Sequence, residues 1–236
     1  MTNIAGAGRN DPLPGYDGLI PCPELDTPSP SSAATLAFGT PTGAPGLDAE
    51  LTSRALGDLL HWEGDLKYLY VDTRGFVTTG IGQLVKDAAA ARELPFIDMR
   101  TGRPATAQQI DQAFGAVQQL PKGRSDPWYA TATHLRLPEE TVRALAQSRL
   151  TNEFLPGLRR ELPHFDSYPP SAQRALIDMA YNLGVGGVGR FHGLRAACEA
   201  GDWSQAAAEC HRRTCRAERN EWTRALFLRA GAEAAR

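Results

Sequence analysis

The stretch EGDLKYLYVDTRGFVTTGIG, residues 63–82, changes from helical to β-strand patterning within a few residues. Before Glu63, Leu56, Leu59 and Leu60 recur at helical spacing, between a possible N-cap at Asp48 and a stop at Gly64. After it, β-branched and aromatic residues surround the polar turn of residues 72–75. The stretch therefore predicts the end of a helix followed by a small hairpin or three-stranded ribbon.

Beyond Lys86 the start and stop signals in the sequence are typical of helices. Thr106 and Gln109 have the spacing of a capping box, and SAQRALIDMAYNLG runs from a polar start at Ser171 to a glycine stop at Gly184. Further helices are expected near residues 138–158, 191–200, 203–214 and 217–230. The predicted fold class is mainly α, with one small β element near the front.

The first 46 residues differ from the rest in composition. They hold eight of the seventeen prolines and show neither helical nor strand periodicity. We therefore expect a Pro/Gly/Ser-rich leader or linker at 1–46 and one domain at 47–236. Within that domain, residues 86–135 form an insert that is expected to make a flap or an extra wall.

Composition excludes several classes of function. No apolar run approaches the roughly 20 residues that cross a bilayer, and the start of the chain lacks the pattern of a secretory signal. The formal net charge of −2 disfavours a nucleic-acid binder, as does the lack of aromatic stacking platforms interleaved with the arginines. The four cysteines are expected to be free thiols at buried or half-buried positions, and CHRRTC (210–215) lacks the second ligand pair of a zinc site.

Two carboxyl groups in the opening stretch suit acid catalysis. Glu63 falls on the leucine stripe of its helix, where burial would raise its pKa and let it hold a proton. Asp72 lies in a polar turn that favours its ionised form. Two acids in such different surroundings are what glycoside hydrolysis requires, and the hydroxyl of Thr78 could hold the attacking water.

The same stretch resembles the signature of the phage-type lysozymes, glycoside hydrolase family 24. The shared pattern is Glu-Gly, aromatic-Xaa-Asp, Gly-aromatic and Thr-Xaa-Gly-Xaa-Gly, in order and spacing. A second block, ALIDMAYNLGVGGVGRF (175–191), is similar to the family's helix ending in aromatic-Asn-Xaa-Gly with a later Phe. A third echo is DWSQAAAEC followed by RNEWTRALFLRAG. Together the blocks cover most of residues 50–231, apart from 86–135.

The resemblance implies an α+β lysozyme-like fold, in which a helical lobe and a small lobe with the ribbon enclose a cleft. It implies cleavage of the β-1,4 bond between N-acetylmuramic acid and N-acetylglucosamine in peptidoglycan, with Glu63 as general acid and with Asp72 and Thr78 positioning the water. Gln83, Gly82 and Asn182 are then expected to bind the saccharide. Gln83 stands where the family usually has a histidine. Tyr181 is expected in the core, and neither a metal nor another cofactor is expected.

Two other functions stay open at this point. A lytic transglycosylase also uses one glutamate, and a non-catalytic peptidoglycan-binding module would keep the cleft without turnover. A monomer that acts in the periplasm or cell wall would need a holin or a specialised secretion apparatus for export, and residues 1–46 could dock to such an apparatus. An antibacterial effector would also need a periplasmic immunity protein in the producer.

Overall fold

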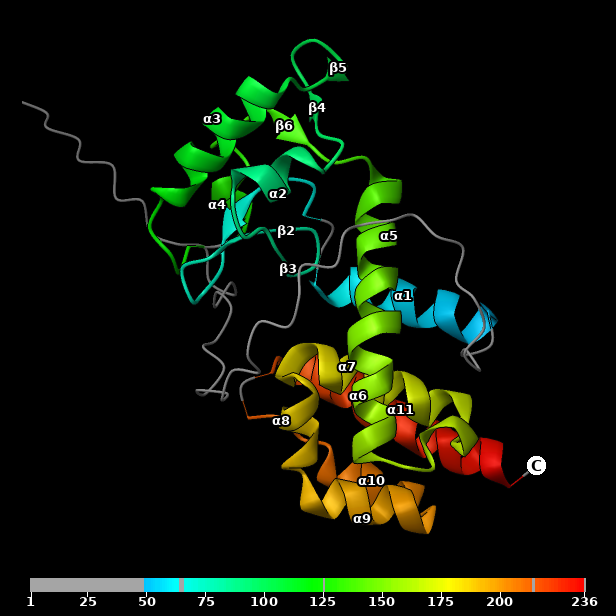
Figure 1. Ribbon diagram of the computed structural model, residues 1–236. Helices are drawn as coiled ribbons and strands as arrows, with labels where there is room; N and C mark the ends of the chain where they lie inside the picture. Colours follow the sequence, from blue (N-terminus) through cyan, green and yellow to red (C-terminus); the bar gives the residue numbers. More distant parts are fainter. Residues whose placement is uncertain (1–48, 64–65, 125, 214, 236) are drawn as a thin grey trace, which may run out of the picture.

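The computed structural model describes residues 49–63, 66–124, 126–213 and 215–235. The predicted leader at 1–46, the possible N-cap Asp48 and the stop Gly64 lie outside this part of the chain. The described part is mainly helical, with two small antiparallel sheets (Figure 1). No helix within it is long and apolar enough to cross a membrane.

The elements follow one another along the chain without a repeat. The helices are α1 (Ala49–Glu63), α2 (Ala88–Arg92), α3 (Ala107–Gln118), α4 (Asp126–Tyr129), α5 (Glu139–Arg149), α6 (Leu155–Glu161), α7 (Pro170–Leu183), α8 (Val185–Gly189), α9 (His192–Ala200), α10 (Trp203–Glu209) and α11 (Ala217–Ala234). The strands are β1 (Tyr70–Val71), β2 (Val77–Thr79), β3 (Gln83–Leu84), β4 (Ile97–Asp98), β5 (Arg103–Pro104) and β6 (Leu135–Arg136).

The predicted ribbon is confirmed as the antiparallel sheet β1-β2-β3. Thr78 of β2 is opposite Tyr70 on one side and Leu84 on the other. Gly75 closes the β1–β2 turn with φ of +95°, a conformation that favours glycine. The ribbon therefore presents the middle of β2 between two short neighbours.

The segment 86–135 builds more structure than the sequence predicted. It holds α2, α3 and α4, and its strands β4 and β5 form a second sheet with β6 in the order β5-β4-β6. The capping box of α3 is confirmed, since Thr106 and Gln109 exchange both hydrogen bonds. Phe96, Ile110 and Phe114 are buried with Val77 and Val85 of the ribbon. The insert is thus part of the core of a small lobe.

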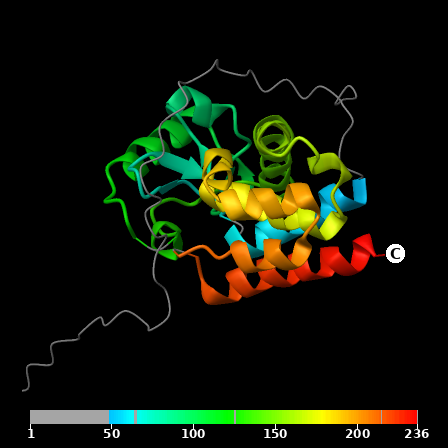
Figure 2. The ribbon, with the colours of Figure 1, turned by 90° about the horizontal axis from the view of Figure 1, so that it is seen from below.

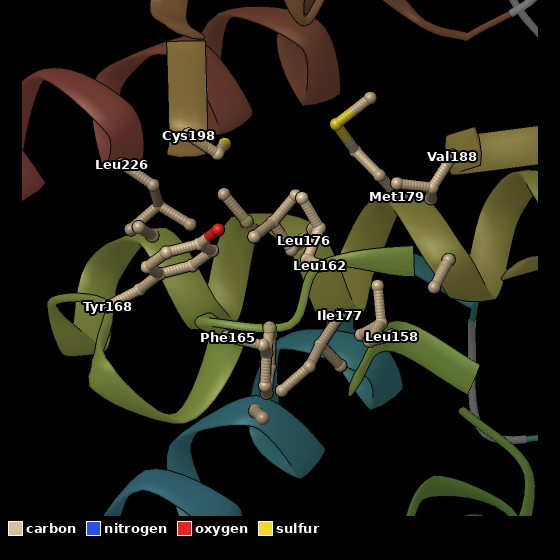
Figure 3. Packing of buried hydrophobic residues seen from close by; sticks show 14 of the residues in the cluster. Leu158, Leu162, Phe165, Tyr168, Leu176, Ile177, Met179, Val188, Cys198 and Leu226 are labelled. Atoms are coloured by element: carbon tan, nitrogen blue, oxygen red, sulfur yellow. The ribbon is translucent and has the colours of Figure 1, made fainter. Parts of the chain in front are cut away.

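A larger hydrophobic cluster holds the C-terminal helices together. The helix α7 is its centre, because nearly every residue of α7 from 171 to 180 is buried. Figure 3 shows Ile177 on the side of Leu158 and Phe165, and Leu176 on the side of Cys198. A helix buried almost all round is typical of the centre of a helical lobe.

The helix α5 joins the two hydrophobic clusters. Its residues Val142 and Leu145 belong to the cluster of the small lobe, whereas Ala146 belongs to the larger cluster. The π-helix η1 (Leu150–Phe154) continues directly from α5. In Figure 1, α5 runs from the sheets towards the C-terminal helices, and Figure 2 views it nearly end-on with α1 beside it. The two lobes therefore share α5 and the C-terminal end of α1 as their connection.

Two smaller expectations have clear outcomes. The helix expected at 203–214 is shorter, because α10 ends at Glu209 and Cys210 is its C-cap. Cys198 and Cys210 are buried free thiols and Cys215 is a half-buried one, while Cys22 lies outside the described residues. Burial raises the pKa of Cys198 to about 12 and that of Cys210 to about 11, so both remain thiols at neutral pH.

Candidate active site

The three residues expected to be catalytic line one cavity between the lobes. Glu63 comes from the end of α1, Asp72 from the β1–β2 turn and Thr78 from β2. The cavity has a volume of about 270 Å³. Its lining consists of Glu63, Leu66, Tyr70, Asp72, Thr73, Thr78, Ile81, Gly82, Arg149 and Tyr181. Helix end and ribbon are thus brought together by the fold, as the sequence predicted for these three side chains.

Asp72 is fixed by the turn that it begins. Its Oδ1 accepts the backbone N–H of Arg74 at 2.9 Å and that of Phe76 at 2.8 Å. This is the usual way in which an aspartate replaces a backbone acceptor in a tight turn. The observed hydrogen bonds engage one oxygen of the carboxylate, so Oδ2 can take part in further contacts in the cavity.

Thr78 is held in a single orientation by its own strand. Its side chain is buried, and its hydroxyl donates to the carbonyl of Phe76 at 3.1 Å. Because the hydroxyl proton is used in this bond, the lone pairs of Oγ1 are what the residue offers to the cavity. Phe76 itself is about half exposed at the hairpin tip.

Glu63 has different surroundings from those predicted. Leu56 and Leu59 are buried on its helix face, as expected, but the carboxylate also forms an ion pair with Arg219 of α11. Nη2 of Arg219 donates to Oε1 of Glu63 at 2.7 Å, and the Glu63 side chain is 20% exposed. The carboxyl therefore lies at the edge of the core beside a charged guanidinium group, and not in the apolar surroundings that the leucine stripe predicted.

Arg219 is itself held by a buried aspartate. Its Nε and Nη2 donate to Oδ1 of Asp178 in α7, at 2.9 and 2.7 Å. Burial alone lowers the pKa of Arg219, but the charges of Glu63 and Asp178 outweigh this and raise it above the ordinary value. Arg219 thus stays charged at neutral pH, and its bonds to Asp178 hold it beside Glu63.

A second buried arginine completes this network. Nη1 of Arg212 donates to Oδ2 of Asp178 at 2.9 Å, and its Nη2 donates to the hydroxyl of Thr223 at 2.6 Å. The side chain of Arg212 has no exposed surface. Asn220 fixes the backbone of Arg212 by accepting its N–H and donating to its carbonyl. We name Asp178, Arg212, Arg219, Asn220 and Thr223 the buried polar network.

Arg149 lines the cavity and is bound to the ribbon. Its Nη1 donates to the carbonyls of Ile81 at 3.1 Å and Gly82 at 2.8 Å, which ties the β2–β3 turn to the end of α5. Burial lowers the pKa of Arg149, but Tyr181 and Glu153 more than compensate and raise it. The residue lies directly before the π-helix η1, and such irregular turns are frequent at functional sites.

The expected saccharide-binding residues do not all face the same cavity. Gly82 lines the cavity with Glu63, and it also lines a neighbouring cavity of about 650 Å³. Gln83 lines only the larger one, where its Nε2 donates to the carbonyl of Leu84. Ala90 and Leu94 of the insert also line it, so the insert supplies a wall as expected. Gly82 and Arg149 line both cavities, so the two cavities are neighbours.

Asn182 lies away from both cavities, and Tyr181 contacts both the core and a cavity. Asn182 is not among the residues that line either cavity, and its Oδ1 accepts from Nη1 of Arg212 at 3.3 Å. Tyr181, expected in the core, packs against the larger cluster but also lines the cavity of Glu63. Its buried hydroxyl lacks a hydrogen-bond partner within the described residues, and burial raises its pKa to about 12.

Sequence reasoning missed three charged residues of the site: Arg149, Asp178 and Arg219. Each occupies a helix position that local patterning cannot connect to Glu63. Asp178 and Arg219 did give one signal, because both fall among apolar residues that the structure buries. A charged side chain on an apolar face needs a partner. Among the described residues, no group of three His, Cys, Asp or Glu side chains has the arrangement of a metal site.

Comparison with known proteins adds no relative to this picture. Neither the models of protein families nor the curated proteins give a match to the chain.

Proposed function

We propose that this chain is a peptidoglycan hydrolase, a muramidase with a lysozyme-like arrangement of two lobes around a cleft. The observation that carries the proposal is the meeting of Glu63, Asp72 and Thr78 in one cavity between a helical lobe and a ribbon-bearing lobe. The resemblance of residues 63–82 and 175–191 to phage-type lysozymes supplies the substrate, the β-1,4 bond between N-acetylmuramic acid and N-acetylglucosamine.

Glu63 would act as the general acid. Arg219 occupies Oε1, so a proton on this carboxyl is carried by Oε2. From there it can pass to the glycosidic oxygen as the bond to the anomeric carbon breaks. The transition state has oxocarbenium character, and a nearby carboxylate stabilises its positive charge. Asp72 is the second carboxylate of the cavity and supplies that stabilisation.

The attacking water would be held by two acceptors. Oδ2 of Asp72 and Oγ1 of Thr78 each have lone pairs, because the turn uses Oδ1 and the hydroxyl proton of Thr78 is given to Phe76. A water molecule that donates one proton to each of them directs its own lone pair at the sugar. Asp72 then accepts a proton as the bond to carbon forms. Arg149 fixes the turn at Gly82 in the wall of the cavity through its hydrogen bond to the Gly82 carbonyl.

The test is Glu63→Gln, with Glu50→Gln at the other end of α1 as the matched control. Release of reducing ends from purified peptidoglycan is measured. We expect Glu63→Gln to lose about 10² to 10⁴ in rate, the usual contribution of a general acid. Its thermal transition should stay close to wild type, because Arg219 keeps its two bonds to Asp178. Turnover at the wild-type rate in this variant would refute the assignment.

The products separate the other two functions. A lytic transglycosylase closes an anhydro ring, so its products are lighter by one water than those of hydrolysis, which mass spectrometry distinguishes. The acceptors at Asp72 and Thr78 favour the path that uses water. A non-catalytic binding module would sediment with peptidoglycan and release no sugar. Action in the cell wall would require delivery by a lysis pore or a secretion apparatus, with an immunity protein in a producer that targets other bacteria.

A further inference from the structure

Exposed cations and aromatic rings gather at the tip of the β1–β2 hairpin and in the nearby segment before α4. Phe76 is 48% exposed and Trp128 is 43% exposed. The guanidinium of Arg74 lies over the Phe76 ring at 5.2 Å, and that of Arg124 lies over the Trp128 ring at 5.7 Å. We name these four residues and Lys122 the hairpin-tip patch.

Lys122 connects the two halves of this patch. A Cβ atom built on Gly75 would lie 3.7 Å from Cδ of Lys122, so the lysine stem passes over the turn of the hairpin. Lys122, Arg74 and Arg124 are all exposed. Within the described part of the chain none of the three forms an ion pair with a carboxylate. Three exposed cations close together make a surface that attracts anions.

The patch directly follows, along the chain, two residues that line the cavity of Glu63. Asp72 and Thr73 line the cavity of Glu63, and Arg74 and Phe76 follow directly in the chain. Oδ1 of Asp72 accepts the backbone N–H of both Arg74 and Phe76, so one turn fixes the cavity wall and the patch together. An extended polymer that leaves the cavity past Thr73 therefore meets the patch next.

We propose that the hairpin-tip patch binds the carboxylates of the stem peptides that hang from a peptidoglycan strand. The inference rests on the proposed function and narrows its substrate to glycan that carries peptides. Guanidinium and ammonium groups form charge-assisted hydrogen bonds with carboxylates. The faces of Phe76 and Trp128 offer apolar area to sugar rings and peptide methyl groups. An amidase that removes the peptides leaves the lactyl carboxylate of each N-acetylmuramic acid, next to the sugar ring, so the stripped strand lacks only the peptide carboxylates that we expect the three cations to bind.

The experiment compares the triple variant Arg74→Gln, Lys122→Gln, Arg124→Gln with wild type. The matched control is Arg103→Gln, Arg143→Gln, Arg160→Gln, which removes three exposed cations that line neither cavity. Each protein is given soluble peptide-bearing glycan strands and the same strands after an amidase has removed the peptides. Thermal unfolding of each variant verifies that it is folded.

We expect the patch variant to show a KM about tenfold higher than wild type on the peptide-bearing strands, with kcat unchanged, since exposed charge pairs are individually modest. On the stripped strands its KM should equal that of wild type. The difference should fade in about 1 M salt, where the Debye length falls to roughly 3 Å. The control variant should behave as wild type on both substrates.

Equal KM values of wild type and patch variant on peptide-bearing strands would overturn the inference while leaving hydrolysis itself intact. The inference is also overturned if the variant loses binding to vesicles of anionic phospholipid and its KM is unchanged, because the patch would then be a membrane-binding surface. Wild type that cleaves neither substrate refutes the proposed function instead. Co-sedimentation with the two kinds of strand then tests the patch by the same tenfold difference in binding.

Discussion

Asp178→Asn tests whether the buried polar network holds Arg219 beside Glu63. Asp178 is 1% exposed and accepts hydrogen bonds from two arginines. Both arginines are almost completely buried, at 1% for Arg212 and 6% for Arg219. Asparagine has the same shape, but it removes the only negative charge that contacts both guanidinium groups in the described structure.

The magnitude follows from the geometry of the two oxygens. Oδ1 of Asp178 accepts two bonds from Arg219, and Oδ2 accepts one from Arg212 and one from Thr223 at 3.3 Å. An asparagine amide must turn its NH₂ towards one of the two arginines, which can only donate. Removing one partner of a buried ion pair costs about 3 to 5 kcal/mol. For a folded part of this size, this corresponds to a thermal transition lowered by roughly 6 to 20 °C.

The assay is thermal unfolding followed by circular dichroism at neutral pH, for wild type, Asp178→Asn and Glu63→Gln. Glu63→Gln removes a carboxylate from the same arginine, but one whose side chain is 20% exposed, and leaves Arg219 paired with Asp178. Its transition should therefore move by a few degrees at most. A transition of Asp178→Asn within that same narrow range would refute the account of the network as a set of mutually neutralised buried charges.

Two further substitutions test the site wall and the pH dependence of stability. Gly82→Ala should destabilise the protein by about 1 to 3 kcal/mol in urea unfolding and raise KM, because Gly82 has φ of +81° and its new Cβ would lie 3.1 Å from Nη1 of Arg149. An unchanged urea midpoint would contradict this strain. Glu199 accepts hydrogen bonds from His164 and Tyr168, and the first of these chiefly lowers the pKa of Glu199. A lowered carboxyl pKa contributes stability at neutral pH that is lost as pH falls through the folded-state value, so wild type should lose more stability than Glu199→Gln between about pH 5 and pH 2. Parallel losses in the two proteins would show that Glu199 does not contribute.

Local pattern was sufficient where one element carries its own signals. The capping box at Thr106 and Gln109, the turn at Asp72 and the stop at Gly184 each involve residues within four positions of one another. Such signals depend on local backbone geometry, so they do not depend on the tertiary packing of the rest of the chain. The trio of Glu63, Asp72 and Thr78 spans sixteen residues and was therefore also within reach of the pattern.

The second sheet could not be predicted in this way. Its strands have two residues each, which is too short for alternation to show. Ile97 of β4 pairs with Arg136 of β6, across most of the insert. The pairing depends instead on the packing of Phe96, Leu135 and the helix α3 into the core of the small lobe. Strand pairing that depends on such tertiary packing cannot be predicted from a short window of sequence.

The partner of Glu63 was likewise not predictable from local sequence, although two buried charged positions gave a clue to it. The leucine stripe correctly predicted a partly buried carboxyl, but its partner Arg219 stands 156 residues further along the chain. In α11, however, Arg219 shares a stripe with Thr223, Leu226 and Phe227, all of them buried. An arginine on an apolar helix face requires a buried acid, because an isolated buried charge is too costly. Asp178, in the buried part of α7, requires a buried base for the same reason. Asp178 and Arg219 therefore neutralise each other. Nη2 of Arg219 carries two protons, so it donates to Asp178 and also to a second carboxylate, that of Glu63, which α1 places at the edge of the core.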